Sequence, residues 1–151
     1  MSIYLFHFSQ SNIEKDKGRS ITKGDEMNII ILSIIILIES SGNPLAFNKH
    51  SQARGLCQIT PVVLQEYNNR HKTEYLPRHL FLPEINKKIA RWYLNKRIPQ
   101  MLKHFKKEVN ERNILISYNA GINYVVKDLP LPPQTKEYLI KYKQKKGGEN
   151  E

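Results

Sequence analysis

Apolar residues dominate one stretch of the chain, residues 28–44, which reads NIIILSIIILIESSGNP. Residues 29–38 are apolar at every position except Ser33. Gly42 can adopt the left-handed conformation that closes a helix, and Pro44 cannot continue one. The run is too short to span a bilayer, which takes about 20 residues. We therefore expect no transmembrane segment here, but a central helix that is buried on all sides in a folded domain.

Glu39 follows the apolar run directly and is expected where this helix leaves the core. Burial and the negative end of the helix dipole both disfavour an ionised carboxylate, so both raise its pKa. A glutamate that keeps its proton near neutral pH is suited to general acid catalysis. The alternative is that Glu39 simply marks the solvent end of the helix, and this stretch alone leaves both interpretations open.

Helical spacing also dominates the rest of the chain, so the expected fold class is mainly α, in one domain. Thr60 is a suitable N-cap and Pro61 a suitable first residue for a helix over residues 61–67. Pro83 is expected to open a longer helix that Pro99 interrupts. Further helices are expected at residues 98–109, 111–120 and 134–142, with loops at residues 45–54, 68–82 and 128–133.

The ends of the chain are polar or mixed in character. Residues 1–27 are expected to form an N-terminal appendage, flexible in part, because they lack the ordered regions of a signal peptide. Residues 28–142 are expected to form the domain, and residues 143–151 a polar tail.

The chain has 24 basic and 14 acidic side chains, a formal net charge of +10. Such a charge indicates an anionic partner, which could be a nucleic acid, an anionic lipid or a bacterial wall polymer. The five histidines show no metal-ligand spacing, and no phosphate-binding loop is present. We therefore expect no metal and no cofactor. The single cysteine, Cys57, is expected to be a small buried thiol, with a nucleophile paired to His50 as the alternative.

Four short motifs occur in a fixed order: ESSGNP at residues 39–44, ARGLCQITP at 53–61, SYNAG at 117–121 and PPQTKEY at 132–138. Together they resemble the soluble lytic transglycosylase (SLT) domain of the lysozyme-like superfamily. That family has a catalytic Glu followed by Ser, then GLMQ-x-x-P, AYNAG and P-x-E-T-x-x-Y. The resemblance covers residues 29–142, and it implies a lysozyme-like domain whose central helix ends at the catalytic Glu.

Four positions depart from the family pattern. Cys57 replaces a Met, Gln52 a Gly, and Ser117 an Ala. Gln134 stands where the family commonly has Glu, and we expect this change to remove a carboxylate from the substrate cleft.

The resemblance implies cleavage of the MurNAc–GlcNAc β-1,4 bond of peptidoglycan without hydrolysis, leaving 1,6-anhydroMurNAc ends. Ordinary glycosidases use two carboxylates, whereas here the C6 hydroxyl of the substrate sugar is the attacking group. One carboxylate then suffices. Glu39 first protonates the leaving oxygen and then, as a base, removes the proton of the C6 hydroxyl.

The resemblance also implies a substrate-binding set: Ser40, Gln58, Tyr118, Asn119, Gln134 and Tyr138. Gln58 would line the cleft, and Tyr118 would bond to Glu39 or to the substrate. Each has a structural alternative: Gln58 could bond loop backbone, Tyr118 could be a core aromatic, and Asn119 could cap a helix. Ser40 could orient the Glu39 carboxyl or cap its helix.

Three other functions stay open. A lysozyme-type hydrolase on the same fold would need a second carboxylate, for which Asp128, Glu66 and Glu74 are the candidates. A weakly active wall-binding or assembly protein would fit the Gln134 departure and the charge. A nucleic-acid-binding protein is suggested by charge alone and is not expected, because the aromatic residues do not cluster with basic ones.

The expected partner is the glycan strand of a bacterial wall, so the expected location is the cell wall, the periplasm or the exterior. No export signal is evident in residues 1–27. Delivery by a secretion, conjugation or phage apparatus is therefore an expectation by analogy with the fold.

Overall fold

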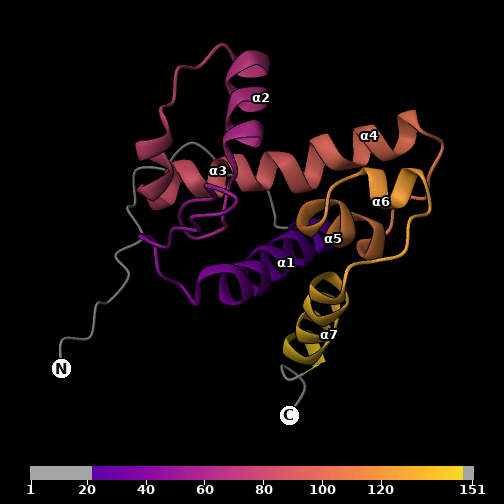
Figure 1. Cartoon of the computed structure of the whole chain (residues 1–151). Helices are drawn as coiled ribbons and strands as arrows, with labels where there is room; N and C mark the ends of the chain where they lie inside the picture. Colours follow the sequence, from indigo (N-terminus) through magenta and orange to yellow (C-terminus); the bar gives the residue numbers. More distant parts are fainter. Residues whose placement is uncertain (1–21, 148–151) are drawn as a thin grey trace.

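Helix α1 (Lys23–Ser40) lies centrally in the molecule, and α3 (Pro83–Trp92) and α7 (Pro133–Gly147) pack against it (Figure 1). The computed structural model describes residues 22–147 of the chain. Regular structure in this part is helical, apart from isolated β-bridges that join Arg54 to Phe47 and to Ile59. The predicted mainly α fold class is therefore confirmed.

Helix α1 is less completely buried than its sequence suggests. Leu32, Ile34 and Ile35 lie in the core, but Ile29 and Leu37 are 56% and 50% exposed. The prediction of a helix buried on all sides was therefore wrong. The reason is that α3 (Pro83–Trp92) and α7 (Pro133–Gly147) pack against α1 but leave part of its circumference uncovered.

The bounds of α1 also differ from the expectation. The helix begins at Lys23, inside the segment assigned to the appendage, while residues 1–21 lie outside the described part of the chain. After Ser40, the backbone turns left-handed at Ser41 (φ 53°) as well as at Gly42 (φ 80°). The Ser41 N–H donates to the Leu37 carbonyl at 3.2 Å, which closes the last turn before Pro44.

Helix α3 continues through a π-helical turn, η4 (Tyr93–Arg97), into α4 (Ile98–His104), forming one long rod (Figure 1). The predicted interruption at Pro99 does not occur. Proline has no N–H and its ring crowds the preceding turn of a helix. That turn is widened here, with the Ile98 N–H bonded to the Tyr93 carbonyl five residues back. The rod therefore accommodates Pro99 by widening instead of breaking.

The π-helical turn also keeps one face of the rod in the core. Ala90, Leu94, Ile98 and Leu102 are all buried and recur every four residues. Three turns of an α-helix contain about 11 residues, because each turn has about 3.6. The three four-residue spacings from Ala90 to Leu102 therefore contain about one residue more than three α-helical turns. A single π-helical turn absorbs that extra residue, which keeps all four side chains on the same face.

The remaining elements start close to their predicted positions but differ in length. Thr60 caps α2, which runs to His71 instead of stopping at Tyr67. Helix α4 ends at His104, so the helix predicted over residues 98–109 is too long, and Phe105 lies outside it, 47% exposed. Helix α7 includes Lys143, which was assigned to a polar tail. The bounds of the other elements are α2 (Pro61–His71), η3 (Pro77–Phe81), α5 (Glu111–Asn119), α6 (Asn123–Val126) and α7 (Pro133–Gly147).

The main core lies where α1, the loop before α2, α3 and α7 meet. It contains Ile35, Cys57, Ile89 and Tyr138 among others. A second cluster joins α4 to α5 and α6 through Leu102, Ile116 and Val125. Within residues 22–147, no helix has both the length and the apolar character needed to cross a membrane.

Candidate active site

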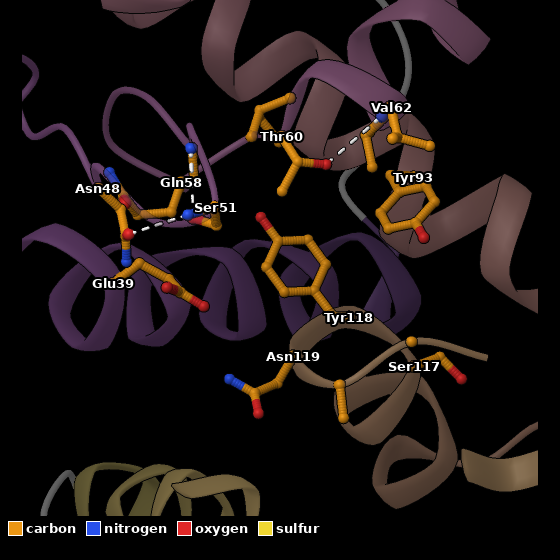
Figure 2. A pocket seen from close by; sticks show the side chains of 15 residues that line it. Glu39, Asn48, Ser51, Gln58, Thr60, Val62, Tyr93, Ser117, Tyr118 and Asn119 are labelled. Atoms are coloured by element: carbon orange, nitrogen blue, oxygen red, sulfur yellow. Dashed lines mark hydrogen bonds between the residues drawn. The ribbon is translucent and has the colours of Figure 1, made fainter. Parts of the chain in front are cut away.

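An open cleft of about 440 Å³ contains Glu39 and is formed by five parts of the chain, one of which is the first turn of α2 with Val62 and Val63 (Figure 2). The end of α1 supplies Glu39, and the loop before α2 supplies Gln58. The end of α5 supplies Tyr118 and Asn119, and η4 supplies Tyr93. The further lining residues are Asn48, Ser51, Ala53, Ile59, Thr60, Val62, Val63, Ser117, Ala120 and Gly121.

The pKa of the Glu39 carboxyl is raised into the neutral range, so both its protonated and its ionised form are populated near pH 7. Burial is the main cause, and it raises the pKa of Glu39 from the ordinary 4.5 to about 7. The Tyr138 hydroxyl, which lies near enough to interact with the carboxyl, opposes this by lowering the pKa. Glu39 is therefore able both to donate a proton and to accept one near neutral pH.

The Tyr138 hydroxyl is buried in α7, outside the lining of the cleft. It forms no hydrogen bond of ordinary length with any described residue. Its pKa is raised by burial and, to a smaller degree, by the charge of Glu39. Tyr138 therefore acts on the carboxyl from the protein side, behind the lining of the cleft.

The loop before α2 is held in place by Asn86, a fully buried residue of α3. The Asn86 amide accepts a hydrogen bond from the Cys57 N–H and donates to the carbonyls of Arg54 and Leu80, each at 2.8 Å. Gly55 has a φ of +79°, and a Cβ there would lie 2.1 Å from the Leu80 carbonyl oxygen. Only glycine fits this position, because the loop passes so close to Leu80 and Asn86.

Gln58 lies in the cleft but uses its amide nitrogen within the loop. The nitrogen donates to the carbonyls of Ala46 at 3.2 Å and Gly55 at 3.1 Å. The Gln58 nitrogen therefore bonds loop backbone, as the structural alternative expected. The amide oxygen of Gln58 has no such bond to the loop and is the atom that could contact substrate. The neighbouring Cys57 is buried, and burial raises the pKa of its thiol to about 12, which makes it inert.

The Tyr118 hydroxyl donates to the Cys57 carbonyl at 2.6 Å, so Glu39 is not its partner. Asn119, the next residue, is exposed at the end of α5 and lines the cleft below Tyr118 (Figure 2). The capping residue of α5 is Ala120, so Asn119 does not cap the helix. Ser117 is fully buried and donates to the Asn113 carbonyl at 2.7 Å, which explains why a small residue occupies this position.

Two other residues of the predicted binding set lie outside the cleft. The Ser40 hydroxyl donates to the Ile36 carbonyl at 3.1 Å, within α1, and thus neither orients Glu39 nor caps the helix. Gln134 is exposed in the first turn of α7 and does not line the cleft. The expectation that this position removes a carboxylate from the cleft was wrong, because α7 presents Tyr138 toward Glu39 and Gln134 toward solvent.

Sequence reasoning missed three polar or aromatic positions near the site. Asn48 lines the cleft, and its amide oxygen accepts hydrogen bonds from the backbone N–H groups of His50 and Ser51 at 2.9 and 3.1 Å. Asn86 could have been found as a polar residue on the core face of a helix. Tyr93 could not have been found, because the π-helical turn that directs it has no local sequence signature.

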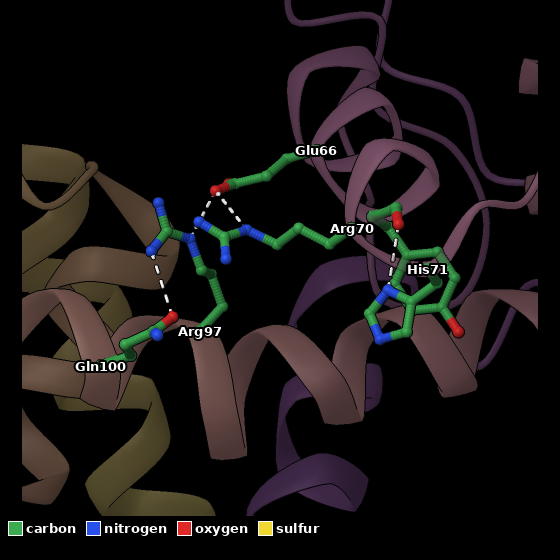
Figure 3. A network of polar contacts seen from close by, with 6 residues as sticks. Glu66, Arg70, His71, Arg97 and Gln100 are labelled. Carbon is green, nitrogen blue, oxygen red and sulfur yellow. Dashed lines mark hydrogen bonds and ion pairs between the residues drawn. The ribbon is translucent and has the colours of Figure 1, made fainter.

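Glu39 is the one carboxylate that lines the cleft in the described part of the chain. Glu66, a candidate for a second carboxylate, instead accepts from Arg97 and Arg70 (Figure 3). Asp128 pairs with Lys107 at 2.7 Å, and Glu74 is exposed outside the cleft. The described residues also contain no cluster of three or more His, Cys, Asp or Glu side chains placed to hold a metal ion.

The family model described as the transglycosylase SLT domain matches residues 19–140, about four fifths of the chain. No curated protein and no solved structure matches.

Proposed function

The chain belongs to the transglycosylase SLT domain family, and on this premise we propose that it is a peptidoglycan lytic transglycosylase with Glu39 as its catalytic residue. The observation that carries the proposal is that, within residues 22–147, Glu39 is the one carboxylate lining the cleft, and burial raises its pKa to about 7. A hydrolase that activates water ordinarily needs a second carboxylate across the scissile bond. A transglycosylase needs only one carboxylate, which acts first as an acid and then as a base, because the attacking hydroxyl belongs to the substrate.

In the first step, protonated Glu39 donates its proton to the glycosidic oxygen between MurNAc and GlcNAc. The bond from that oxygen to C1 of MurNAc breaks, and the positive charge that develops at C1 is stabilised by the N-acetyl group of the same sugar. In the second step, the Glu39 carboxylate removes the proton of the C6 hydroxyl, and the C6 oxygen bonds to C1. Glu39 regains its proton, and no water is consumed.

The cleft supports this cycle by holding the loop and the helix ends in fixed positions. Asn86 and Tyr118 both bond the backbone of Cys57, next to Gln58. Such preorganisation matters because a catalytic group must be within hydrogen-bond reach of the proton it transfers. We propose that Gln58, Asn119 and Asn48 supply polar contacts to the sugars, and that Tyr138 tunes Glu39 from behind.

The anionic bacterial wall is a fitting partner for a chain with a formal net charge of +10. We therefore propose that the protein acts at the cell wall, where its glycan substrate lies. The hydrolase and the wall-binding alternatives share this location, and product analysis separates them.

The proposal is tested by digesting purified peptidoglycan with the native chain, Glu39→Gln and Glu74→Gln, and reading the products by mass spectrometry. Glu74→Gln is the matched control, because Glu74 is exposed outside the cleft. We expect anhydro-ended muropeptides from the native chain and the control, and none from Glu39→Gln. Reducing ends from the native chain would indicate a hydrolase. Wall binding without any product would indicate a binding protein.

A further inference from the structure

The cleft changes character along its length. Around Glu39 it is polar, with Asn48, Gln58 and Asn119 among its lining residues, whereas Val62 and Tyr93 line it beyond Tyr118 (Figure 2). Tyr118 lies between Glu39 and Tyr93 in this view, and the Tyr93 ring centroid is 5.9 Å from that of Tyr118. The apolar end of the cleft is therefore separated from the Glu39 carboxyl by the ring of Tyr118.

The backbone of the rod directs Tyr93 to this place. Tyr93 opens the π-helical turn, and its carbonyl accepts the N–H of Ile98. Leu94, the next residue, is buried in the core, while Tyr93 is only partly buried and lines the cleft. π-helical turns are rare and occur frequently at functional sites, and here the turn supplies the cleft with an aromatic ring.

An ion pair one helical turn away joins the two elements that carry Val62 and Tyr93. Val62 and Glu66 are four residues apart on α2, and Tyr93 and Arg97 are four residues apart on the rod. Glu66 accepts a hydrogen bond from Arg97 (Figure 3), so the two helices are joined next to the cleft. Glu66 and Arg97 are largely shielded from solvent, with side chains 28% and 19% exposed.

Val62 is 74% exposed in the first turn of α2, so packing in the core does not account for its apolar side chain. An exposed valine beside a partly buried tyrosine ring forms a surface with apolar character and one hydroxyl. Sugar rings present C–H groups on one face and hydroxyl groups at the edge, which suits a wall of this kind. Ligand sites commonly combine apolar walls with a few polar groups in this way.

We propose that Tyr93 and Val62 form a binding site for a sugar ring of the glycan that is remote from the scissile bond, with the C–H face of the sugar against the Tyr93 ring. This inference rests on the proposed function, because it takes the cleft to hold a glycan strand. Binding energy from a remote part of a substrate contributes to turnover only when the substrate is long enough to reach it. The site therefore makes the enzyme prefer longer glycans.

The test compares peptidoglycan oligosaccharides of two and four disaccharide units, with kcat and KM measured for each length. The variants are Tyr93→Leu, Tyr93→Phe and Val62→Ser, and the matched control is Phe105→Leu. Phe105 is an exposed aromatic at the end of the same rod, away from the cleft lining. Affinity of both oligosaccharides for the same variants in the Glu39→Gln background gives a readout that does not depend on turnover.

For the longer oligosaccharide, we expect Tyr93→Leu to reduce kcat/KM and affinity about tenfold, which corresponds to about 1.4 kcal/mol of lost binding free energy. Val62→Ser should reduce them several-fold. Tyr93→Phe, which keeps the ring and removes the hydroxyl, should reduce them less than Tyr93→Leu, and Phe105→Leu should change them less than twofold. The shorter oligosaccharide should be affected less than twofold by every variant.

Several outcomes would contradict the proposal that Tyr93 and Val62 bind a sugar ring. Equal losses on both lengths would mean that Tyr93 only supports the fold or the catalytic centre. If Tyr93→Leu does not fold, an unchanged length preference in Val62→Ser, which is exposed and tolerant, would reject the proposal by itself. Failure of the native chain to cleave or bind any glycan would instead reject the proposed function on which the site rests.

Discussion

The Tyr118 hydroxyl donates a 2.6 Å hydrogen bond to the Cys57 carbonyl, joining the end of α5 to the loop before α2 across 61 positions of the sequence. The bond lies beside Gln58 and within the cleft that holds Glu39. Tyr118 thus fixes two walls of the cleft relative to each other. Its hydroxyl is committed to this bond, and burial raises its pKa well above the ordinary value.

We expect Tyr118→Phe to destabilise the protein by about 1–3 kcal/mol, because the change leaves the carbonyl of a buried residue without its donor. The value of kcat should fall more than KM changes, since the end of α5 and the loop before α2 are no longer held in fixed positions relative to each other. Thermal or denaturant unfolding measures the first effect and steady-state kinetics the second. Tyr124→Phe, at a partly buried tyrosine outside the cleft lining, is the control and should leave kcat unchanged.

Glu39 makes both stability and activity depend on pH. Its pKa is 4.5 when unfolded and about 7 when folded, so the folded state binds more protons between these values. Stability should therefore fall as pH rises from about 4.5 to about 7, by a total of about 3 kcal/mol. Activity should fall above about pH 7, since the first step needs the protonated acid.

Glu39→Gln, which does not titrate, supplies the control for this pH dependence. The difference in unfolding free energy between Glu39→Gln and the native chain should grow from about pH 4.5 and level off above about pH 7. Denaturant titrations at pH 4, 6 and 8 measure it. If this difference is the same at all three pH values, folding does not raise the pKa of Glu39.

Tyr138→Phe should raise the pKa of Glu39 further, because the hydroxyl near the carboxyl lowers that pKa. The decline in kcat/KM at high pH should then move to higher pH. At pH 4, where Glu39 is largely protonated in both states, stability should change little or increase, since the removed hydroxyl is buried and has no hydrogen-bond partner among the described residues. Above about pH 7, stability should fall, because a higher folded-state pKa of Glu39 costs more there. A pH–rate profile that moves to lower pH would contradict this account of Tyr138.

Asn86→Ala should be among the most destabilising changes near the site, with a cost of about 3 kcal/mol or more. It removes three hydrogen bonds to backbone groups in a buried setting, and each unsatisfied group costs about 1–3 kcal/mol. Asn69→Ala, at an exposed position of α2, should cost less than about 1 kcal/mol. Equal midpoints of thermal unfolding for the two variants would refute the role given to Asn86.

Gln134→Glu should change kcat/KM less than twofold, although the family commonly has Glu there. Gln134 is exposed on α7 and does not line the cleft, so a carboxylate at this position does not reach the sugars directly. The assay with peptidoglycan measures the effect. A gain of tenfold or more would mean that α7 contributes to the cleft through this position.

The sequence by itself determined those features that depend on neighbouring residues. The apolar run before Glu39 fixed the central helix, and Thr60 with Pro61 fixed the start of α2. The order of the four motifs indicated the family, and Glu39 was singled out because a carboxylate directly after an apolar helix is unusual. Propensity, capping and periodicity act over a few residues, which is why these features could be predicted.

Tertiary structure decided which side chains meet. The Asn86 bond to Cys57 spans 29 positions and the Tyr118 bond spans 61, and no local pattern encodes either partner. The same holds for Tyr93, whose direction depends on a π-helical turn that reconciles Pro99 with a buried stripe of the rod. Burial of Glu39 and exposure of Gln134 likewise depend on how α7 packs on α1, because solvent access is a property of the assembled fold.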